Sequence, residues 1–313
     1  MSEERDMLRA TVAALVEKHA NPEAVRTAMA SDKGYDENLW QLLCEQVGAA
    51  ALIIPEELGG AGGELADAAV VLEELAKGLV PTPLLSTTLA EVALLAVDNH
   101  EPLEGLAEGT SVGTVVFDAG YVLNGDVADV VIAAQDGRLT RWTDVTATPS
   151  TAMDPTRRLA AVTAGATENL GADPGVADTA AILMAVEQVG AAARCLDLTV
   201  AYTKDRVQFG RPIGSFQALK HRMSDLYVKV SAARSIVNDA VADPTPTNAS
   251  LARFMATEAF NAVAAEAIQM HGGIAITWEH DIQLYFKRAH GSAQLLGPAR
   301  EHLRRLEAEA LQA

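Results

Sequence analysis

The sequence predicts a mainly α-helical protein with a small β-sheet region between two helical blocks. Hydrophobic residues make up 49% of the chain and aromatic residues only 4%, a composition typical of a helical soluble protein. Apolar residues recur at helical spacing up to about residue 97 and again from Val176 onward. Between about 110 and 165, short β-rich runs are separated by Gly, Asn and Asp.

The N-terminal block predicts helices over 5–20, around 37–43, over 64–79 and over 84–97. Between the second and third lies a short apolar run that closes in a glycine-rich turn at 48–63. No Lys-Ser/Thr pair follows these glycines, so the turn is not expected to bind phosphate as a P-loop does.

The C-terminal block predicts long helices over 176–204, 215–241 and 248–271, and a last one over 279–311 that is interrupted at Gly291 and Gly297. Four helices joined by short breaks indicate an antiparallel four-helix bundle. We therefore expect an N-terminal helical domain (1–100), a shortened β domain (101–170) and a four-helix bundle domain (171–313).

Composition also limits the function classes. The formal net charge is −18, which disfavours nucleic-acid binding. No continuous apolar run approaches the ~20 residues that span a bilayer, and the acidic N-terminus is unlike a secretory signal, so we expect a cytoplasmic protein without a membrane partner. Cys44 and Cys195 lie in apolar helical patterns and are expected to be buried thiols. No His/Cys spacing indicates a metal site.

One stretch, residues 202–222, departs from the acidic character of the chain. It carries five cations against one acid, Asp205, with Phe209 and Phe216 among them; the cations are Lys204, Arg206, Arg211, Lys220 and Arg222. A local cluster of this kind favours a small anionic ligand. The alternative is a solvated corner between two helices.

Three motifs, which follow one another along the chain in the order typical of the acyl-CoA dehydrogenase family, resemble that family. Arg206-Val-Gln-Phe-Gly-Arg-Pro-Ile-Gly-Ser-Phe-Gln217 resembles its signature between bundle helices, Gln269-Met-His-Gly-Gly-Ile-Ala-Ile-Thr277 its second signature, and Ile54-Pro-Glu-Glu-Leu-Gly-Gly60 its N-terminal turn. The resemblance is strong over 176–290, moderate over 35–90 and weak over 100–165.

The resemblance implies FAD bound across a subunit interface, with this chain supplying contacts. Arg206 would hold the pyrophosphate, as a guanidinium can do bidentately. Phe209 would pack on the apolar surface of the cofactor, and Gln217 would hydrogen-bond to it. The other expected contacts are Gln269, Gly272 and Gly273. The alternative keeps Phe209 in the core and the two glycines as a helix C-cap.

The sequence departs from the family in two respects. The Thr-Glu-Pro and Gly-Ser-Asp segments that cradle the isoalloxazine ring are absent between 100 and 165. The glutamate base, needed to remove the α-proton of the thioester, is also missing from both family positions, which here hold Gly297 and Ala180. Glu187 and Asp178 are the remaining weak candidates for a base.

These departures predict the smaller, non-catalytic subunit of a heteromeric acyl-CoA dehydrogenase. It would complete the FAD site of a second subunit, in a heterodimer or α2β2 heterotetramer. The resemblance to actinobacterial steroid side-chain enzymes implies a bulky acyl-CoA substrate, a β-oxidation-type desaturation in lipid metabolism, and an electron-transfer flavoprotein as acceptor. Open alternatives are a homomeric dehydrogenase with a displaced base, an oxidase, and a scaffold protein without flavin.

Overall fold

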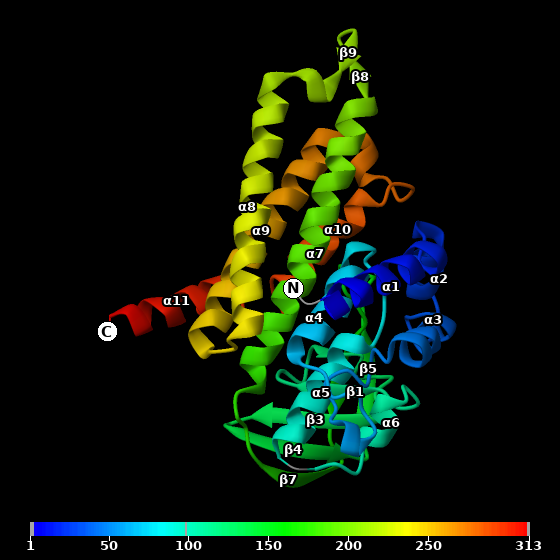
Figure 1. Cartoon of the computed structure of the whole chain (residues 1–313), viewed down its shortest axis with the longest axis vertical. Helices are drawn as coiled ribbons and strands as arrows, with labels where there is room; N and C mark the ends of the chain where they lie inside the picture. The colour runs from blue at the N-terminus through cyan, green and yellow to red at the C-terminus, as the bar shows by residue number, and fades with distance from the viewer. Residues whose placement is uncertain (1–2, 98, 312–313) are drawn as a thin grey trace.

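The computed structural model describes residues 3–97 and 99–311 and shows an elongated molecule (Figure 1). The strands between residues 113 and 172 lie at one end, long helices run to the other, and the N-terminal helices lie against the lower part of the bundle (Figure 1). The chain is mainly helical with a small β portion between two helical regions, and this confirms the predicted fold class.

Within residues 3–97 and 99–107, the N-terminal region forms six α-helices, α1 (Glu3–His19), α2 (Pro22–Met29), α3 (Glu37–Leu42), α4 (Leu65–Lys77), α5 (Leu84–Ala96) and α6 (Leu103–Ala107). A π-helical turn (Leu43–Val47) extends α3, and a short 3₁₀ turn (Glu56–Leu58) follows it. The sequence predicted neither α2 nor α6. Asn21 begins α2 by accepting a hydrogen bond from the amide of Ala24 at 2.9 Å, as an N-cap does.

The glycine-rich turn has a structural explanation. A Cβ at Gly60 would lie 2.0 Å from the carbonyl oxygen of Ile54, so the backbone can approach this closely only at glycine. The turn closes on itself through backbone hydrogen bonds, including Gly62 N to Ile54 O at 2.9 Å. Its compact form explains the glycines without any ligand.

The β region forms two small sheets. The first has the order β1-β3-β4-β7 and the second β2-β6-β5; the strands are β1 (Gly113–Val116), β2 (Val122–Leu123), β3 (Val130–Gln135), β4 (Arg138–Thr143), β5 (Thr146–Ser150), β6 (Leu159–Thr163) and β7 (Ala166–Ala172). Strands β1 and β3 pair in parallel, while the other neighbours are antiparallel.

Up to residue 311, the C-terminal region forms five α-helices, α7 (Val176–Asp205), α8 (Gln217–Ala242), α9 (Pro246–His271), α10 (Ile282–Ser292) and α11 (Ala299–Ala310). Helices α7, α8, α9 and α10 lie side by side as the predicted bundle, with a hairpin of β8 (Val207–Gln208) and β9 (Arg211–Pro212) at its far end (Figure 1). Helix α11 projects away from the bundle (Figure 1), so the segment expected as one interrupted helix is two separate helices.

Helix α7 corrects one expectation from the sequence. It is long and apolar enough to cross a membrane by length and composition, but 72% of its apolar window is buried inside the protein. Its apolar character is therefore explained by its place in the bundle, against α4 and α9. Cys195 on α7 and Cys44 are both buried free thiols, as predicted.

Candidate functional site

The basic stretch folds into the hairpin at the end of the bundle. Helix α7 ends at Asp205, where Arg206 turns the chain and its amide donates to the carbonyl of Tyr202 at 2.9 Å. Strands β8 and β9 pair through Val207 with Pro212 and Gln208 with Arg211. The two residues between them, Phe209 and Gly210, have φ angles of 53° and 77°. Positive φ at both positions is the requirement of a tight type I′ turn.

Phe209 is unusual in both conformation and exposure. A bulky residue with positive φ is a strained outlier, and its side chain is 93% exposed. Its only ring contact among the described residues is edge-on with Phe216, at 6.2 Å between centroids. The Arg211 guanidinium lies 3.9 Å from the centre of the Phe216 ring. The structure thus presents Phe209 to the surroundings and does not use it as core.

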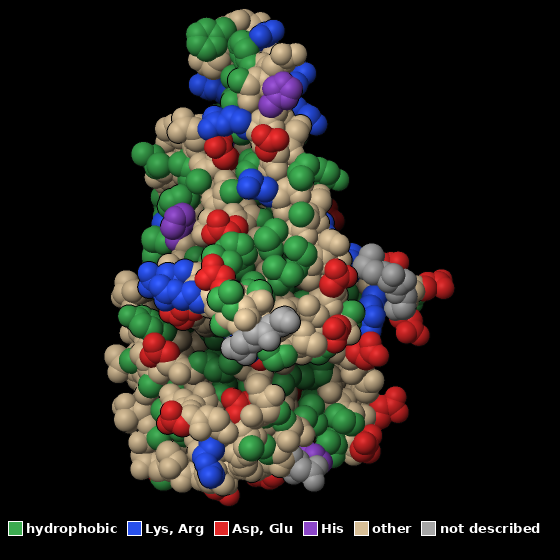
Figure 2. Space-filling view, turned by 90° about the vertical axis from the view of Figure 1, so that its left-hand side faces the viewer, with side chains coloured by type: hydrophobic (Ala, Val, Ile, Leu, Met, Phe, Trp, Pro, Cys, Tyr) green, Lys and Arg blue, Asp and Glu red, His purple; other side chains and the backbone are tan. Residues whose placement is uncertain are grey.

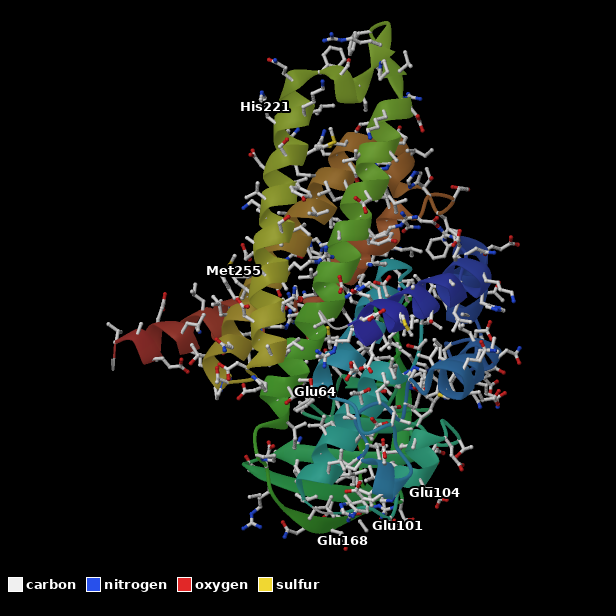
Figure 3. The ribbon with its side chains drawn as sticks, in the orientation of Figure 1. Glu64, Glu101, Glu104, Glu168, His221 and Met255 are labelled. Atoms are coloured by element: carbon white, nitrogen blue, oxygen red, sulfur yellow. The ribbon has the colours of Figure 1, made fainter. Side chains whose placement is uncertain are left out.

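The cations of this stretch are almost entirely free of acidic partners. Arg222 pairs with Glu266 at 2.8 Å. Within residues 3–97 and 99–311, no carboxylate pairs with the other four cations, Lys204, Arg206, Arg211 and Lys220. Lysine and arginine side chains gather at this end of the molecule (Figure 2), and His221 lies beside them on α8 (Figure 3). Glu101, Glu104 and Glu168 lie at the opposite end (Figure 3).

A shallow depression of about 250 Å³ lies under the hairpin. It brings together two of the predicted cofactor contacts, Phe209 and Gln269, from segments about sixty residues apart; the other lining residues are Gln208, Ile213, Phe216, Leu219, Arg222 and Met270. Gln217, the first residue of α8, directly follows the lining residue Phe216 and is exposed. Arg206 is exposed but does not line the depression.

Gly272 and Gly273 follow α9. Gly272 caps the helix with φ 65° and ψ −145°, a conformation close to the region that only glycine adopts readily. A Cβ on either glycine would meet nothing within 4 Å. The adjacent His271 is buried, stacks on Tyr202 at 4.2 Å, and its Nδ1 lies 2.8 Å from the carbonyl oxygen of Ala267. His271 therefore joins α7 to α9.

The two weak base candidates are both held in ion pairs. Glu187 accepts a hydrogen bond from Arg157 at 2.6 Å, with its side chain 13% exposed. Asp178 is bound by the two terminal nitrogens of Arg305, at 2.6 and 3.1 Å. A carboxylate held by a guanidinium is not free to approach a substrate, so this geometry favours neither residue as a base.

The two positions at which the resembled family places its catalytic base hold residues without an acidic side chain in this chain. Ala180 is fully buried in α7. Gly297, with φ 84°, lies in the loop between α10 and α11. This loop borders a cavity of about 760 Å³.

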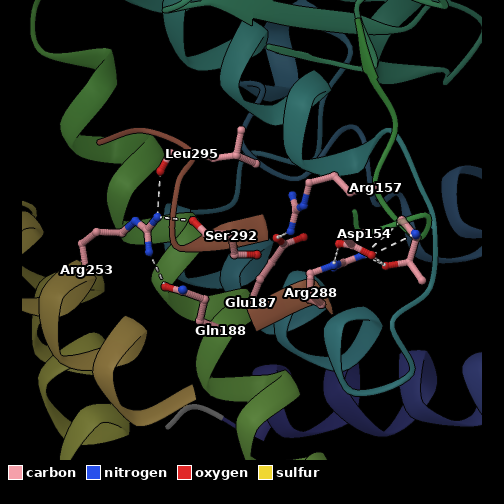
Figure 4. A network of polar contacts seen from close by, with 9 residues as sticks. Asp154, Arg157, Glu187, Gln188, Arg253, Arg288, Ser292 and Leu295 are labelled. Carbon is pink, nitrogen blue, oxygen red and sulfur yellow. Dashed lines mark hydrogen bonds and ion pairs between the residues drawn. The ribbon is translucent and has the colours of Figure 1, made fainter. Parts of the chain in front are cut away.

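A buried polar network that the sequence did not predict lies beside this loop (Figure 4). Arg253 is fully buried on α9 and donates to the side chain of Gln188 and to the carbonyls of Ser292 and Leu295. Arg288 donates to Asp154 at 2.6 Å. The network fixes the α10–α11 loop against α9. Polar residues at otherwise apolar helical positions, such as Gln188 and Arg253, were the only sequence signal for it.

Comparison with known proteins agrees with the motifs. Residues 2–100 match the family model described as acyl-CoA dehydrogenase, N-terminal domain, and residues 175–311 match acyl-CoA dehydrogenase, C-terminal domain. The chain is 74% identical over 309 residues to the acyl-CoA dehydrogenase IpdE2 of Mycolicibacterium smegmatis, with 99% of each chain covered.

Two solved structures are also similar over nearly the whole chain. The Tcur3481-Tcur3483 steroid ACAD G363A variant superposes with a TM-score of 0.92 at 26% identity, covering 99% of each chain. The ChsE4-ChsE5 complex from Mycobacterium tuberculosis gives a TM-score of 0.91 at 25% identity, covering 100% of this chain and 98% of the other. Both descriptions name two proteins together.

Proposed function

Because the chain belongs to the acyl-CoA dehydrogenase family, we propose that it is the subunit of a heteromeric acyl-CoA dehydrogenase that contributes FAD contacts to a partner subunit. The observation that carries this proposal is the exposed hairpin at the end of the bundle. It presents a strained, exposed Phe209 among cations that have no acidic partner in the described part of the chain.

The chemistry of these residues fits a dinucleotide. Arg206 and its neighbouring cations suit the pyrophosphate, because an unpaired guanidinium binds phosphate oxygens without first losing an ion pair. Phe209 and the depression that it shares with Gln269 suit an apolar ring system. Gly273, with open space where a side chain would be, allows close approach of a ligand to the backbone. Bound FAD would accept the hydride in the desaturation reaction.

The remaining catalytic groups are assigned to the partner subunit. Removal of the α-proton requires a free carboxylate, while Glu187 and Asp178 are held by arginines and the family positions hold Gly297 and Ala180. The segments expected to cradle the isoalloxazine ring are missing from the β region. We assign the base and the ring pocket to the partner for these reasons.

The similar proteins suggest the assembly and the substrate class of the chain. One similar structure is described as a complex of two proteins, and the other names two proteins together as a steroid ACAD. Both support a heterodimer or α2β2 heterotetramer that acts on a bulky, steroid-derived acyl-CoA. An electron-transfer flavoprotein is the proposed electron acceptor. We also keep domain boundaries near residues 100 and 170 as part of the proposal, supported by the family matches that end at 100 and begin at 175.

The proposal is tested by co-expression. The chain is purified alone and with its partner, and bound FAD and thioester oxidation are measured for each. We expect FAD and activity only in the complex, and substitution Arg206→Ala to lower FAD stoichiometry several-fold while the complex still forms. Arg304→Ala, an exposed arginine on α11, is the matched control.

Other outcomes would point to the alternatives. Full activity of the lone chain, abolished by Glu187→Gln, would indicate a homomeric enzyme with a displaced base. A colourless complex would indicate a scaffold protein without flavin. Rapid turnover with oxygen as the sole acceptor would indicate an oxidase.

A further inference from the structure

The segment 272–281 joins α9 to α10 and carries Gly272 and Gly273, two of the proposed flavin contacts. A histidine lies at each end of this segment. His271 is the last residue of α9, and His280 lies two residues before the first residue of α10. Both glycines are exposed, so their own contacts do not fix the backbone. The position of the glycines therefore depends on the residues that anchor the segment.

The side chain of His271 joins the start of the segment to two helices. Its Nδ1 lies 2.8 Å from the carbonyl oxygen of Ala267 on α9, and because a carbonyl only accepts, this nitrogen carries a proton. Its ring stacks on Tyr202 of α7, with 4.2 Å between the centroids and 22° between the planes. Tyr202 also donates its hydroxyl to the backbone carbonyl of His271 at 3.3 Å.

The ring of His280 contacts the same stack from the other end of the segment. It lies edge-on to His271, at 4.9 Å between centroids, and to Tyr202, at 6.2 Å. Its Nδ1 accepts a hydrogen bond from the backbone amide of Ile282 at 3.2 Å. An amide only donates, so this nitrogen carries no proton. His280 therefore satisfies one of the free amides at the start of α10 and holds the end of the segment against α9.

A proton added to either ring acts against these contacts. On His280, a proton at Nδ1 removes the acceptor of the Ile282 amide and places positive charge at a helix N-terminus, which is itself positive. On His271, a proton charges a buried ring. Burial lowers the pKa of His271; the hydrogen bond to Ala267 opposes this, and the nearby His280 lowers the pKa further. The hold is therefore complete above about pH 6.5, the ordinary histidine pKa, and is lost as the pH falls through the lower folded-state value.

No acid compensates a charge on the stack. Within residues 3–97 and 99–311, no carboxylate pairs with either histidine. The neighbouring acids Asp281 and Glu266 are paired with Arg26 of α2 and Arg222 of α8, at 2.6 and 2.8 Å. The other charged residues on the surrounding elements form no ion pair in the described part of the chain; they are Lys204 and Asp205 of α7, Glu279 of the segment and Lys287 of α10.

We propose that His271 and His280 together are positioning residues, which hold Gly272 and Gly273 in place for the flavin only while both rings are neutral. This inference rests on the proposed flavin contacts of the two glycines. Neither ring touches the flavin, and each acts through the backbone of the segment. A fall in pH loosens both anchors, so flavin retention depends on pH although the glycines themselves do not titrate.

The test is amide hydrogen exchange in residues 272–282 of the full chain, in the assembly in which it is purified. Exchange is measured by mass spectrometry at about pH 7.5 and about pH 5.5, on either side of the ordinary histidine pKa, and is divided by the intrinsic rate at each pH. We expect protection of this segment to fall several-fold at the lower pH, while the glycine-rich turn at 48–63 keeps its protection. Bound FAD in the complex should fall in parallel.

Two substitutions separate the contacts of the rings from their charge. His280→Asn keeps an acceptor for the Ile282 amide, as an N-cap does, and His271→Phe keeps an aromatic ring on Tyr202; neither new side chain takes up a proton. The double variant should keep protection and flavin content at both pH values. His280→Ala, which has no acceptor, should lower protection at both.

His290→Asn is the matched control, since His290 lies on α10 and its Nδ1 is 3.0 Å from the carbonyl oxygen of Phe286 in the same helix. It should leave the pH dependence of the wild type unchanged. A pH dependence that survives the double variant, or an equal loss of protection in residues 48–63, would overturn the inference. A complex without flavin at any pH would instead overturn the proposed function, and the exchange measurement would still decide whether the histidines hold the segment.

Discussion

At the scale of single residues, Glu91 is an acid in an environment very different from water. It lies on α5 with its side chain fully buried, and its Oε1 has no hydrogen-bond partner in the described part of the chain. Burial raises the pKa of Glu91 well above its ordinary value. The folded protein therefore favours the neutral acid at this position.

This shift predicts a pH-dependent stability. Because the folded-state pKa is raised, the native state binds more protons than the unfolded state between the two pKa values, and the free energy of unfolding falls as pH rises above about 4.5. Glu91→Gln should remove this loss, so its stability relative to wild type should be greater at pH 8 than at pH 5. Denaturant unfolding at both values measures this. An equal difference in stability between Glu91→Gln and wild type at both pH values would contradict this prediction. Glu104→Gln, at an exposed site, is the control.

The residues of the candidate site differed in how well the sequence predicted them. Arg206, Phe209 and Gln269 could be proposed because cations and aromatics cluster in a short stretch and match a family motif. The buried arginines could not, because their partners lie far away in sequence; Arg288 and Asp154 are 134 residues apart. Nothing in a local pattern indicates such a pairing, and only the packing of the sheet region on α10 creates it.

At the scale of elements, the hairpin joining α7 and α8 combines strain with exposure. Phe209 adopts a left-handed conformation that costs most non-glycine residues about 1–2 kcal/mol, yet its side chain gains little from contacts within this chain. Such strain at an exposed position is typical of a binding site. We therefore expect the hairpin to contribute more to assembly with a partner than to the stability of the lone chain.

Phe209→Asn separates these two roles. Asparagine tolerates the left-handed conformation, so the unfolding midpoint of the lone chain should not fall, while FAD retention by the complex should fall several-fold. Gly210→Ala, which places a second side chain at positive φ, should instead weaken the hairpin. Thermal unfolding and flavin absorbance report the two effects. A large loss of stability in Phe209→Asn, with normal flavin content, would show that Phe209 serves the fold.

The burial pattern and length of each element explain which helices and strands could be predicted from the sequence. Helices α8 and α9 were predicted to within a few residues because each buries one apolar face. Helix α7 was predicted equally well from its long apolar stretch, which is buried on all sides from Ala180 to Val186. Strand β7 was missed because all of its residues are exposed or half-buried, without alternation. Strand β5 is equally polar and contains Pro149. Helix α6 has only five residues, too few to show a helical period.

At the scale of the whole molecule, a buried ion pair between Arg288 and Asp154 helps to fasten the sheet region to the bundle. Arg288 on α10 donates to Asp154 at 2.6 Å and to the carbonyl of Thr156 at 3.0 Å. Both side chains of the pair are at most 6% exposed. Opposite charge raises the pKa of Arg288 against the lowering effect of its burial, so each charge depends on the other for its stability in the interior.

Breaking this pair should therefore destabilise the whole chain. Arg288→Met leaves Asp154 as a buried unpaired charge, and loss of one partner of a buried pair costs about 3–5 kcal/mol. Arg222→Met, which breaks the exposed pair with Glu266, should cost about 0–1 kcal/mol. The double substitution Asp154→Leu with Arg288→Met should recover most of the loss, because an apolar pair leaves no buried charge. Denaturant unfolding measures all three, and a loss for Arg288→Met no larger than for Arg222→Met would show that the sheet is held by apolar packing alone.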